Sequence, residues 1–289
     1  MSEPTLGILG GSGLYDLVGL EDRKEVAVET PFGNPSDTFV TGTMFGVRMA
    51  FLPRHGRGHR LAPHELPFRA NLHAMKQLCM QCVVGISAVS SMREELRPGE
   101  LVLVDQFLDR TRGRTEESTF FGNGCVAHAH FADPVWEPLR KLALEAARAA
   151  GAVAHDGGTY LCMEGPLFST RAESRLYRSW GVDVIGMTNL QEAKLAREAE
   201  IAYTTVALVT DYDCWHESEA DVDVSAVLAV LKQNADLARR VVVELARGIS
   251  KGPRISAAGT MQHSLITQPG AISADARRRL QLLIGQYLG

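Results

Sequence analysis

Short apolar runs alternate along the chain with longer stretches in which apolar residues recur every three or four positions. The short runs predict buried strands, and the recurring pattern predicts helices that cover them. The predicted strands are Thr5–Leu9, Thr38–Gly42, Val47–Leu52, Val83–Ala88, Leu101–Asp105, Thr159–Met163, Asp183–Ile185 and Ile201–Val209. The predicted helices are Glu65–Cys82, Pro134–Ala150, Thr170–Trp180, Leu190–Ala199, Asp223–Ile249 and Ser273–Tyr287.

This alternation predicts an α/β fold, with a mostly buried, mixed central β-sheet and helices on both of its faces. We find no internal repeat and no interdomain linker, so residues 1–289 are expected to form a single domain. The segment Gly248–Ile272 is rich in Gly, Pro, Ser, Thr and Gln and is the least regular part. We expect it to cross the surface, so that the last helix docks on the body or on a neighbouring subunit.

Composition narrows the classes of function. The net charge of −4 provides no basic field that would attract nucleic acid. No membrane partner and no secretion signal are expected, because the chain has neither a long apolar run nor a basic N-terminal flank. Five cysteines without framework spacing favour reduced thiols and a cytoplasmic location. Cys79 and Cys82, in a stretch that looks helical, are interpreted as ordinary thiols.

Glycines surround Ser12 directly after the first predicted strand, in the stretch LGILGGSGLYDL. This loop lacks the third glycine of a dinucleotide fingerprint and the lysine of a triphosphate loop. Bare backbone N–H groups beside one hydroxyl suit a single anion such as phosphate. A plain glycine turn is the alternative.

Polar residues that suit an anion follow two other predicted strands, where α/β proteins place ligand contacts. Arg54 and His55 come directly after the strand that ends at Leu52. A guanidinium group matches phosphate oxygens bidentately. Ser87 and Ala88 end a buried strand and offer a hydroxyl and a backbone N–H to the same anion. The alternatives are a solvated basic loop and a tight turn.

Two later stretches place candidate ligand contacts beside helix starts. Thr188 precedes a predicted helix with Gln191 at capping-box spacing, and a helix N-terminus is itself an anion site. Met187 beside it suits a sugar. Phe168 and Ser169 precede another helix, and the phenylalanine suits stacking on a planar base. Helix capping and core packing are the alternatives.

Asp211 and Asp213 flank Tyr212 after the longest predicted strand. Strand alternation predicts that both carboxylates point the same way. Such a pair suits metal binding, acid catalysis or loop capping. No metal is expected, because neither this pair nor His128 and His130 belongs to a firm set of ligands.

These stretches belong to a collinear set that runs from about residue 5 to residue 247. The set comprises GILGGSGL, TPFGNPSD, RHGRGH, SMREELRPGE, DQFLDRT, EGPLFSTRAES, GMTNLQEAKLAREAEI and TDYDCW. It resembles the trimeric purine nucleoside phosphorylase family, and within it the members that act on 5′-methylthioadenosine. Residues from about 250 to 289 match only loosely.

The resemblance implies a nucleoside phosphorylase-like fold and a homotrimer. It implies phosphorolysis of 5′-methylthioadenosine to adenine and 5-methylthioribose 1-phosphate, a step of methionine and purine salvage. Inorganic phosphate would be the co-substrate, and neither a metal nor an organic cofactor is implied.

The same resemblance assigns roles to individual residues. The phosphate would be held by Ser12, Arg54, His55, Ser87, Ala88 and Thr188. The nucleoside would be contacted by Phe168, Ser169, Met187, Asp211, Tyr212, Asp213, Val224, Val227 and the neighbouring subunit's copy of His128. Asp211 would be the acid that protonates the leaving base at its N7 nitrogen, which requires a raised pKa, and Asp213 would accept from the exocyclic amine.

Two other functions stay open. One is a 6-oxopurine phosphorylase acting on methylthioinosine or purine nucleosides, against which the Asp-Tyr-Asp sequence weighs because a carboxylate suits an amine rather than a carbonyl. The other is a nucleoside-binding protein without catalysis. The sequence also departs from the family pattern, with Ser12 and Ser87 replacing threonines, Ser90 replacing a glycine and Gly186 standing where some relatives carry asparagine.

Overall fold

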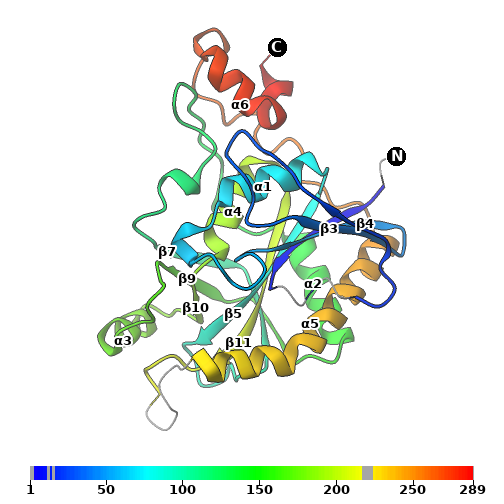
Figure 1. Ribbon diagram of the computed structural model, residues 1–289. Helices are drawn as coiled ribbons and strands as arrows, with labels where there is room; N and C mark the ends of the chain where they lie inside the picture. Colours follow the sequence, from blue (N-terminus) through cyan, green and yellow to red (C-terminus); the bar gives the residue numbers. More distant parts are fainter. Residues whose placement is uncertain (1–2, 12–13, 15–16, 217–223, 289) are drawn as a thin grey trace.

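The computed structural model describes residues 3–11, Leu14, 17–216 and 224–288, and within them it shows a mixed β-sheet flanked by helices (Figure 1). The expected fold class is confirmed. The strands are β1 (Thr5–Gly10), β2 (Glu21–Val26), β3 (Phe39–Met44), β4 (Val47–Pro53), β5 (Cys82–Ser91), β6 (Leu101–Val104), β7 (Gln106–Arg110), β8 (Ala154–Asp156), β9 (Thr159–Met163), β10 (Val184–Gly186) and β11 (Ala202–Asp211). The helices are α1 (Phe68–Gln77), α2 (Glu137–Ala149), α3 (Arg171–Ser179), α4 (Asn189–Glu198), α5 (Val224–Lys251) and α6 (Ala274–Ile284).

Four neighbouring parallel strands form the centre of the sheet. β4 pairs with β1, β1 with β5 and β5 with β11, all in parallel. These strands are buried along almost their whole length, which explains their near-continuous apolar sequence. β10 pairs with the end of β5 in the antiparallel direction and with β9 in parallel. The carboxyl ends of the four central strands therefore meet at one edge.

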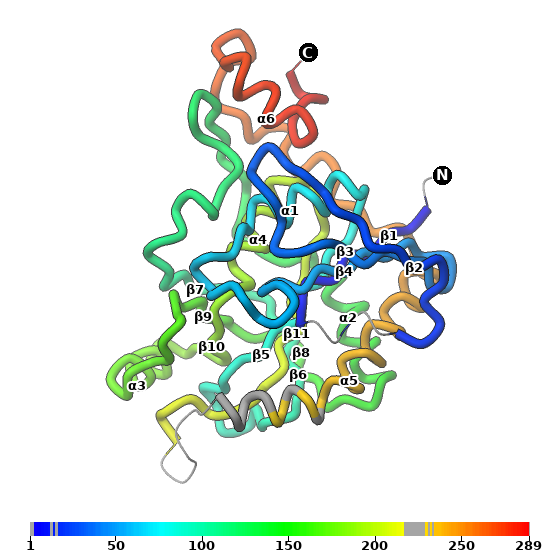
Figure 2. The backbone as a smooth tube through the Cα atoms, viewed as in Figure 1, coloured from blue at the N-terminus to red at the C-terminus, as the bar shows by residue number. Residues whose placement is uncertain are grey.

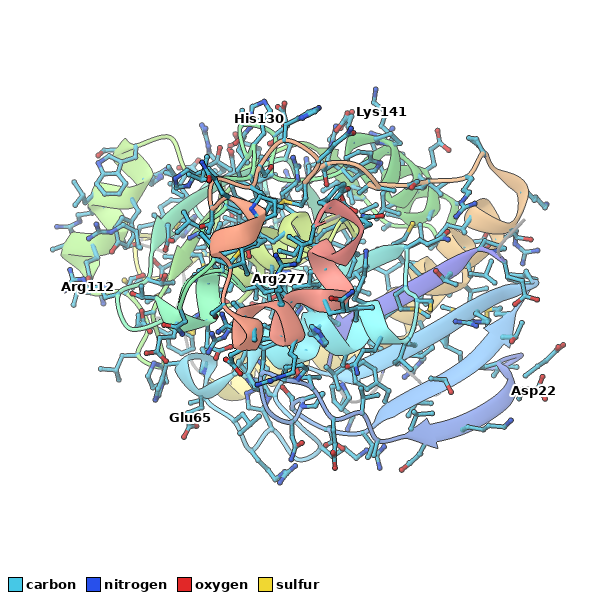
Figure 3. All side chains as sticks on the ribbon, turned by 90° about the horizontal axis from the view of Figure 1, so that it is seen from above. Asp22, Glu65, Arg112, His130, Lys141 and Arg277 are labelled. Carbon is cyan, nitrogen blue, oxygen red and sulfur yellow. The ribbon has the colours of Figure 1, made fainter. Side chains whose placement is uncertain are left out.

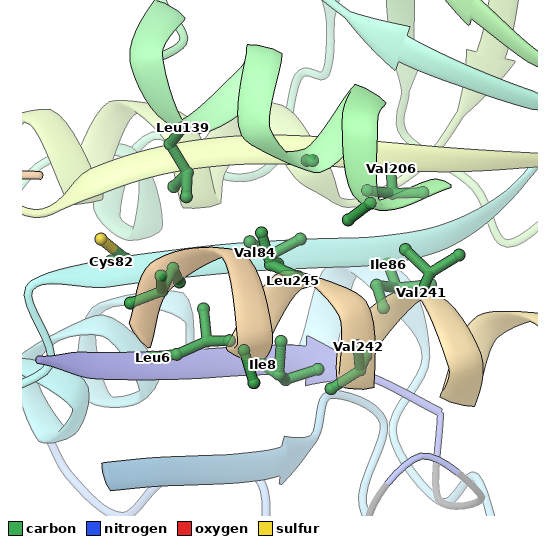
Figure 4. Packing of buried hydrophobic residues seen from close by; sticks show 14 of the residues in the cluster. Leu6, Ile8, Cys82, Val84, Ile86, Leu139, Val206, Val241, Val242 and Leu245 are labelled. Atoms are coloured by element: carbon green, nitrogen blue, oxygen red, sulfur yellow. The ribbon is translucent and has the colours of Figure 1, made fainter. Parts of the chain in front are cut away.

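Helices cover the sheet on both faces (Figure 1). On one face, α2 and α5 pack together and contribute Leu139 and Leu245 to a cluster that includes Leu6 and Val206, which lie on β1 and β11 (Figure 4). On the other face, α1 and α4 pack together over a second apolar cluster. None of the helices in the described residues combines the length and apolar character needed to cross a lipid bilayer.

The predicted helix Glu65–Cys82 is wrong at its C-terminal end. The helix ends at Gln77, and Cys79 has a left-handed backbone with φ of 61°. Cys82 is already the first residue of β5. The apolar run that continues past the helix belongs to the strand, so Cys79 is exposed and Cys82 is buried on different elements.

Three strands were not expected, namely β2, β7 and β8. β2 lies at one edge of the sheet, and its sequence EDRKEV is charged and exposed. Charged residues are typical of edge strands, where they discourage pairing with another chain. They also remove the apolar signal from which a strand is predicted.

The segment after α5, residues 252–288, is called here the C-terminal extension. It docks on its own chain, where Leu280 and Met261 join a cluster with Phe120 (Figure 2). Glu200 fastens it: its carboxylate accepts hydrogen bonds from the backbone N–H of Met261 at 3.0 Å and the hydroxyl of Tyr287 at 2.5 Å. The last helix was expected to dock either on the body of the chain or on a neighbouring subunit. In the structure it docks on the body of its own chain.

Replacing Glu200 by alanine should loosen the C-terminal extension. Buried donors left without an acceptor cost about 1–3 kcal/mol each, so we expect a lower melting temperature. Hydrogen exchange should quicken at the amide of Met261 and its neighbours. Glu145→Ala, at an exposed position of α2, is the matched control. Unchanged exchange in the Glu200 variant would show that apolar packing alone holds the extension.

Candidate active site

The carboxyl-end edge of the sheet gathers the residues that were expected to bind an anion. Arg54 follows β4, and the last residues of β4 and β1 lie side by side. Ser87 and Ala88 lie in the outer half of β5, and both are partly accessible. Ser12 comes after β1 but lies outside the described residues.

Thr188 reaches the same edge from the opposite direction. β10 runs antiparallel to the end of β5, with Ile185 opposite Ser90, and the chain then continues to Thr188 at the start of α4. Thr188 is buried, and its hydroxyl lies 3.1 Å from the Asn189 side-chain oxygen. The expected capping box is wrong, because Gln191 instead donates to the Thr111 hydroxyl at 3.0 Å. The N-terminus of α4 therefore lies beside β5.

Arg54 is buried and bound on nearly all sides. Its Nε and Nη2 donate to the two carboxylate oxygens of Glu192, the latter over 3.1 Å. Nη1 donates to the Ile86 carbonyl at 3.0 Å, and Nη2 also to the Leu9 carbonyl at 3.1 Å. These bonds use four of the five N–H groups. One Nη1 hydrogen has no partner among the described residues, so Arg54 can offer a ligand a single N–H there and not the expected bidentate contact in this arrangement.

Glu192 is the acidic partner that the sequence did not reveal. Its exposed fraction is 1 %, and Tyr203 donates its hydroxyl to Glu192 Oε2 at 2.7 Å. Asn189 donates to the same tyrosine oxygen at 3.0 Å. A Cβ atom on Gly85 would lie 2.5 Å from Asn189 Nδ2 and 2.7 Å from Glu192 Oε2, so only glycine fits there. Burial alone would lower the pKa of Arg54, but the Glu192 carboxylate raises it.

His55 is held as a neutral acceptor. Its Nδ1 lies 2.8 Å from the Leu61 carbonyl, which can only accept, so Nδ1 carries the hydrogen. The ring stacks on His59 with centroids 4.2 Å apart. Burial, reinforced by the positive charge of Arg54, lowers the pKa of His55 to about 4. Its Nε2 lone pair is therefore available to a hydroxyl of a phosphate or a sugar.

The two aspartates come together through a turn. The Asp213 backbone is left-handed with φ of 53°, and its N–H donates to the Asp211 carboxylate at 2.9 Å. Thr210 donates its hydroxyl to the same carboxylate at 2.7 Å. Asp213 is 3 % exposed, and its Oδ2 has no hydrogen-bond partner in the described part of the chain. Burial and the neighbouring Asp211 charge raise the pKa of Asp213. A raised pKa is what an acid that protonates a leaving base requires.

The loop after β9 lies against the aspartates. The Cys214 thiol lies 3.3 Å from the Ser169 carbonyl, which joins this loop to the turn. The Phe168 ring is 42 % exposed and therefore open to a planar ligand. Tyr212 donates its hydroxyl to the Glu94 carbonyl at 3.3 Å, and its ring stacks on His216. These contacts favour a supporting position for Tyr212.

Arg114 fixes the backbone around Met187, and sequence reasoning missed it. Its buried guanidinium donates to the carbonyls of Met187 and Glu164. The Glu164 carboxylate in turn accepts the backbone N–H groups of Arg112 and Gly113, at 2.5 Å and 3.1 Å. The buried Arg114 guanidinium therefore holds both Met187, the candidate sugar contact, and Glu164, at the start of the loop that carries Phe168.

The described contacts do not place the other three candidate residues, His128, Val224 and Val227, at this edge of the sheet. His128 is exposed on a loop whose backbone pairs with the C-terminal extension, with its N–H 2.8 Å from the Ser264 carbonyl. Figure 3 shows His130, on the same loop, at the periphery. Val224 and Val227 begin α5, but their side chains lie outside the described residues.

Ser90 fits where a glycine was expected. It lies in β5, pairs with Ile185 and Asp211, and has no left-handed backbone conformation. Among the described residues no group of three or more His, Cys, Asp or Glu side chains is arranged to hold a metal ion. The arrangement instead places the candidate anion contacts near Arg54 and the aspartate pair, of which Asp213 is buried, at the same edge of the sheet.

Comparison with known proteins identifies the family of this chain. The profile of the Phosphorylase superfamily matches residues 5–247. The chain is 56 % identical over 286 residues to the S-methyl-5′-thioadenosine phosphorylase of Geobacter sulfurreducens, covering 99 % of this chain and 100 % of that protein. It is 54 % identical to the enzyme of the same name from Koribacter versatilis, covering 98 % and 97 %.

Solved structures show the same fold. The methylthioadenosine phosphorylase from an antarctic soil metagenomic library superposes with a TM-score of 0.91 at 45 % identity, covering 98 % of this chain and 99 % of that one. The Schistosoma mansoni methylthioadenosine phosphorylase in complex with adenine gives 0.79 at 34 % identity, covering 86 % and 93 %. The fold and the site define a nucleoside phosphorylase, and the chain belongs to the Phosphorylase superfamily. The relatives with which it shares about half of its residues or more are the S-methyl-5′-thioadenosine phosphorylases.

Glu192→Gln should leave the Arg54 charge buried without its partner. Breaking a buried ion pair in this way costs about 3–5 kcal/mol of unfolding free energy. Glu137→Gln, which breaks a half-exposed pair with Arg140, should cost about 1 kcal/mol or less. Inorganic phosphate should raise the melting temperature of the Glu192 variant more than that of the unaltered protein, since it supplies the missing negative charge. Equal shifts would contradict a phosphate site at Arg54.

His55 should make folding stability depend on pH. Its pKa of about 4 in the folded chain lies below the ordinary 6.5, so the unfolded chain binds the extra proton between these values. The contribution of His55 is therefore complete above pH 6.5 and is lost as the pH falls towards 4. His55→Gln should flatten the measured dependence of unfolding free energy on pH in this window, whereas exposed His263→Gln should not. Identical slopes for both variants would contradict a buried neutral His55.

Proposed function

We propose that this chain catalyses the phosphorolysis of 5′-methylthioadenosine to adenine and 5-methylthioribose 1-phosphate. The observation that carries the proposal is the placement of the buried Arg54 and of an aspartate pair, of which Asp213 is buried, at the same edge of the sheet. The names of the most similar relatives, at 54–56 % identity over nearly the whole chain, support the same substrate.

The phosphate would lie between the end of β5 and the start of α4. The Arg54 Nη1 hydrogen that has no partner among the described residues, the hydroxyls of Ser87 and Thr188 and the backbone N–H of Ala88 would donate to its oxygens. His55 would accept the hydrogen of a monoprotonated phosphate. We include Ser12 in this set on the family resemblance alone.

The base would lie between the Phe168 ring and the aspartate turn. As the bond between the sugar C1′ and the base N9 breaks, its electron pair moves to the base, and N7 must gain a proton. A phosphate oxygen then forms the new bond to C1′, which has acquired positive charge. We propose that Asp211 and Asp213 together hold the proton. Asp211 is assigned to N7 and Asp213 to the exocyclic amine, and burial at Asp213 supports a protonated pair.

The aspartate pair favours adenine over a 6-oxopurine. A carboxylate accepts from an exocyclic amine but would face the lone pairs of a carbonyl. A mismatched buried hydrogen bond costs about 1–3 kcal/mol, which corresponds to a preference of about 5- to 150-fold. Methylthioinosine is therefore the poorer substrate in this proposal.

The proposal includes a homotrimer in the cytoplasm, with Met187 against the ribose. Val224, Val227 and the neighbour's copy of His128 would line the methylthio pocket on the family resemblance. Leu176 of α3 and Trp180, which directly follows this helix, are exposed in the single chain, as expected of a subunit interface. Inorganic phosphate is the co-substrate.

Asp211→Asn and Asp213→Asn should each lower kcat for 5′-methylthioadenosine by about 10²–10⁴-fold, because the leaving base loses its acid. Asp236→Asn, an exposed position on α5, is the control. Adenine release should be followed by chromatography with and without phosphate, and methylthioinosine should be run in parallel. Faster cleavage of methylthioinosine would favour the 6-oxopurine phosphorylase. Binding without release from either nucleoside would favour the non-catalytic protein.

A further inference from the structure

Tyr160 places a fully buried hydroxyl beside Thr188, one of the residues proposed to hold the phosphate. It lies on β9, which pairs with β10, and its side chain is 0 % exposed. Its oxygen lies 3.4 Å from the backbone nitrogen of Thr188 at the start of α4. The ring is held in place by Phe107, with ring centroids 5.4 Å apart.

The same tyrosine determines which residue fits at position 186. A Cβ atom on Gly186 would overlap the Tyr160 hydroxyl oxygen and would lie 2.6 Å from the ring carbon that bears it. Neither the fully buried ring nor the strand can move away without disturbing the core. The Tyr160 phenol can therefore reach Thr188 only because residue 186 has no side chain.

The hydroxyl still has a hydrogen to give. Its oxygen accepts the Thr188 N–H, while no acceptor for its own hydrogen occurs among the hydrogen bonds of the described residues. Burial raises the pKa of Tyr160, and the hydrogen bond from Thr188 opposes the rise without cancelling it. The phenol therefore stays protonated, and its oxygen lies 3.4 Å from the nitrogen of Thr188, a residue that the proposed function places beside the phosphate.

We propose that Tyr160 is a positioning residue of the phosphate site, and that Gly186 is required because the phenol occupies the space above it. The hydroxyl oxygen accepts the backbone N–H of Thr188, so the phenol fixes where the Thr188 side chain lies beside the proposed phosphate position before the anion binds. This inference rests on the proposed function for the identity of the anion. It also explains why glycine is accommodated at position 186, where some relatives carry asparagine.

The first test removes only the hydroxyl. Tyr160→Phe keeps the ring, so a role in packing alone would leave phosphate affinity unchanged. We expect the Kd for inorganic phosphate, measured by titration calorimetry, and the KM for phosphate to rise about 3- to 10-fold, as for the loss of one hydrogen bond. The kcat at saturating phosphate should change less than about 2-fold. Tyr177→Phe, a buried tyrosine of α3 in a separate cluster, is the control.

The second test examines the coupling between the two positions. Gly186→Ala should raise the Kd for phosphate at least about 10-fold, because the new Cβ displaces the phenol. In a Tyr160→Leu background, which removes the overlapping atoms, the same substitution should change the Kd less than about 3-fold. Equal effects of Gly186→Ala in both backgrounds, or an unchanged phosphate Kd in Tyr160→Phe, would overturn the inference.

The calorimetric readout separates this inference from the proposed function. Phosphate binding is measured without nucleoside and without turnover. If the unaltered protein failed to cleave 5′-methylthioadenosine but Tyr160→Phe still weakened phosphate binding, the proposed function would fall and the role of Tyr160 would stand. If the unaltered protein cleaved 5′-methylthioadenosine but the Tyr160 variant bound phosphate normally, the proposed function would stand and the role of Tyr160 would fall.

Discussion

The ion pair between Arg54 and Glu192 is the interaction on which the site depends. Two charges removed from water are costly unless each is fully hydrogen-bonded. Here the guanidinium is bound by Glu192 and by two strand carbonyls, and the carboxylate is bound by Tyr203. These bonds join β1, β4, β5, β11 and α4 at one point. The edge of the sheet is thereby held rigid before any ligand arrives, with one arginine hydrogen that no described residue accepts.

The rest of the site follows from this fixed edge. α4 carries Glu192 in its first turn, so the ion pair also sets where its N-terminal N–H groups lie. β5 runs from Ser87 and Ala88, the proposed phosphate contacts, to the aspartate turn, and Asp211 pairs with Ser90 near its end. In the proposed function, one strand therefore sets the separation between the phosphate and the acid. Catalysis by such an arrangement is a matter of positioning reactants and of charges already in place.

The sequence reveals the elements and the single residues better than the contacts between them. The central strands and most helices were predicted because their apolar periodicity reflects burial on one or both faces. β2 was missed because its residues are charged, and α1 was extended too far because apolar residues run on into β5. Arg54 and Asp213 stand out beside strand ends. Glu192, Gly85 and Tyr160 do not, since their roles exist only where distant segments meet. Asp213 joins Asp211 by a left-handed turn, not by strand alternation.

The central claim is that the pocket at Arg54 delivers phosphate to the sugar. Phosphorus-31 nuclear magnetic resonance of a reaction of the purified protein with 5′-methylthioadenosine and phosphate tests it most directly. The account predicts loss of the inorganic phosphate signal and growth of one sugar 1-phosphate signal, in equal amount to the adenine released. Release of adenine with unchanged inorganic phosphate would mean hydrolysis, and it would contradict a catalytic phosphate site at the carboxyl-end edge.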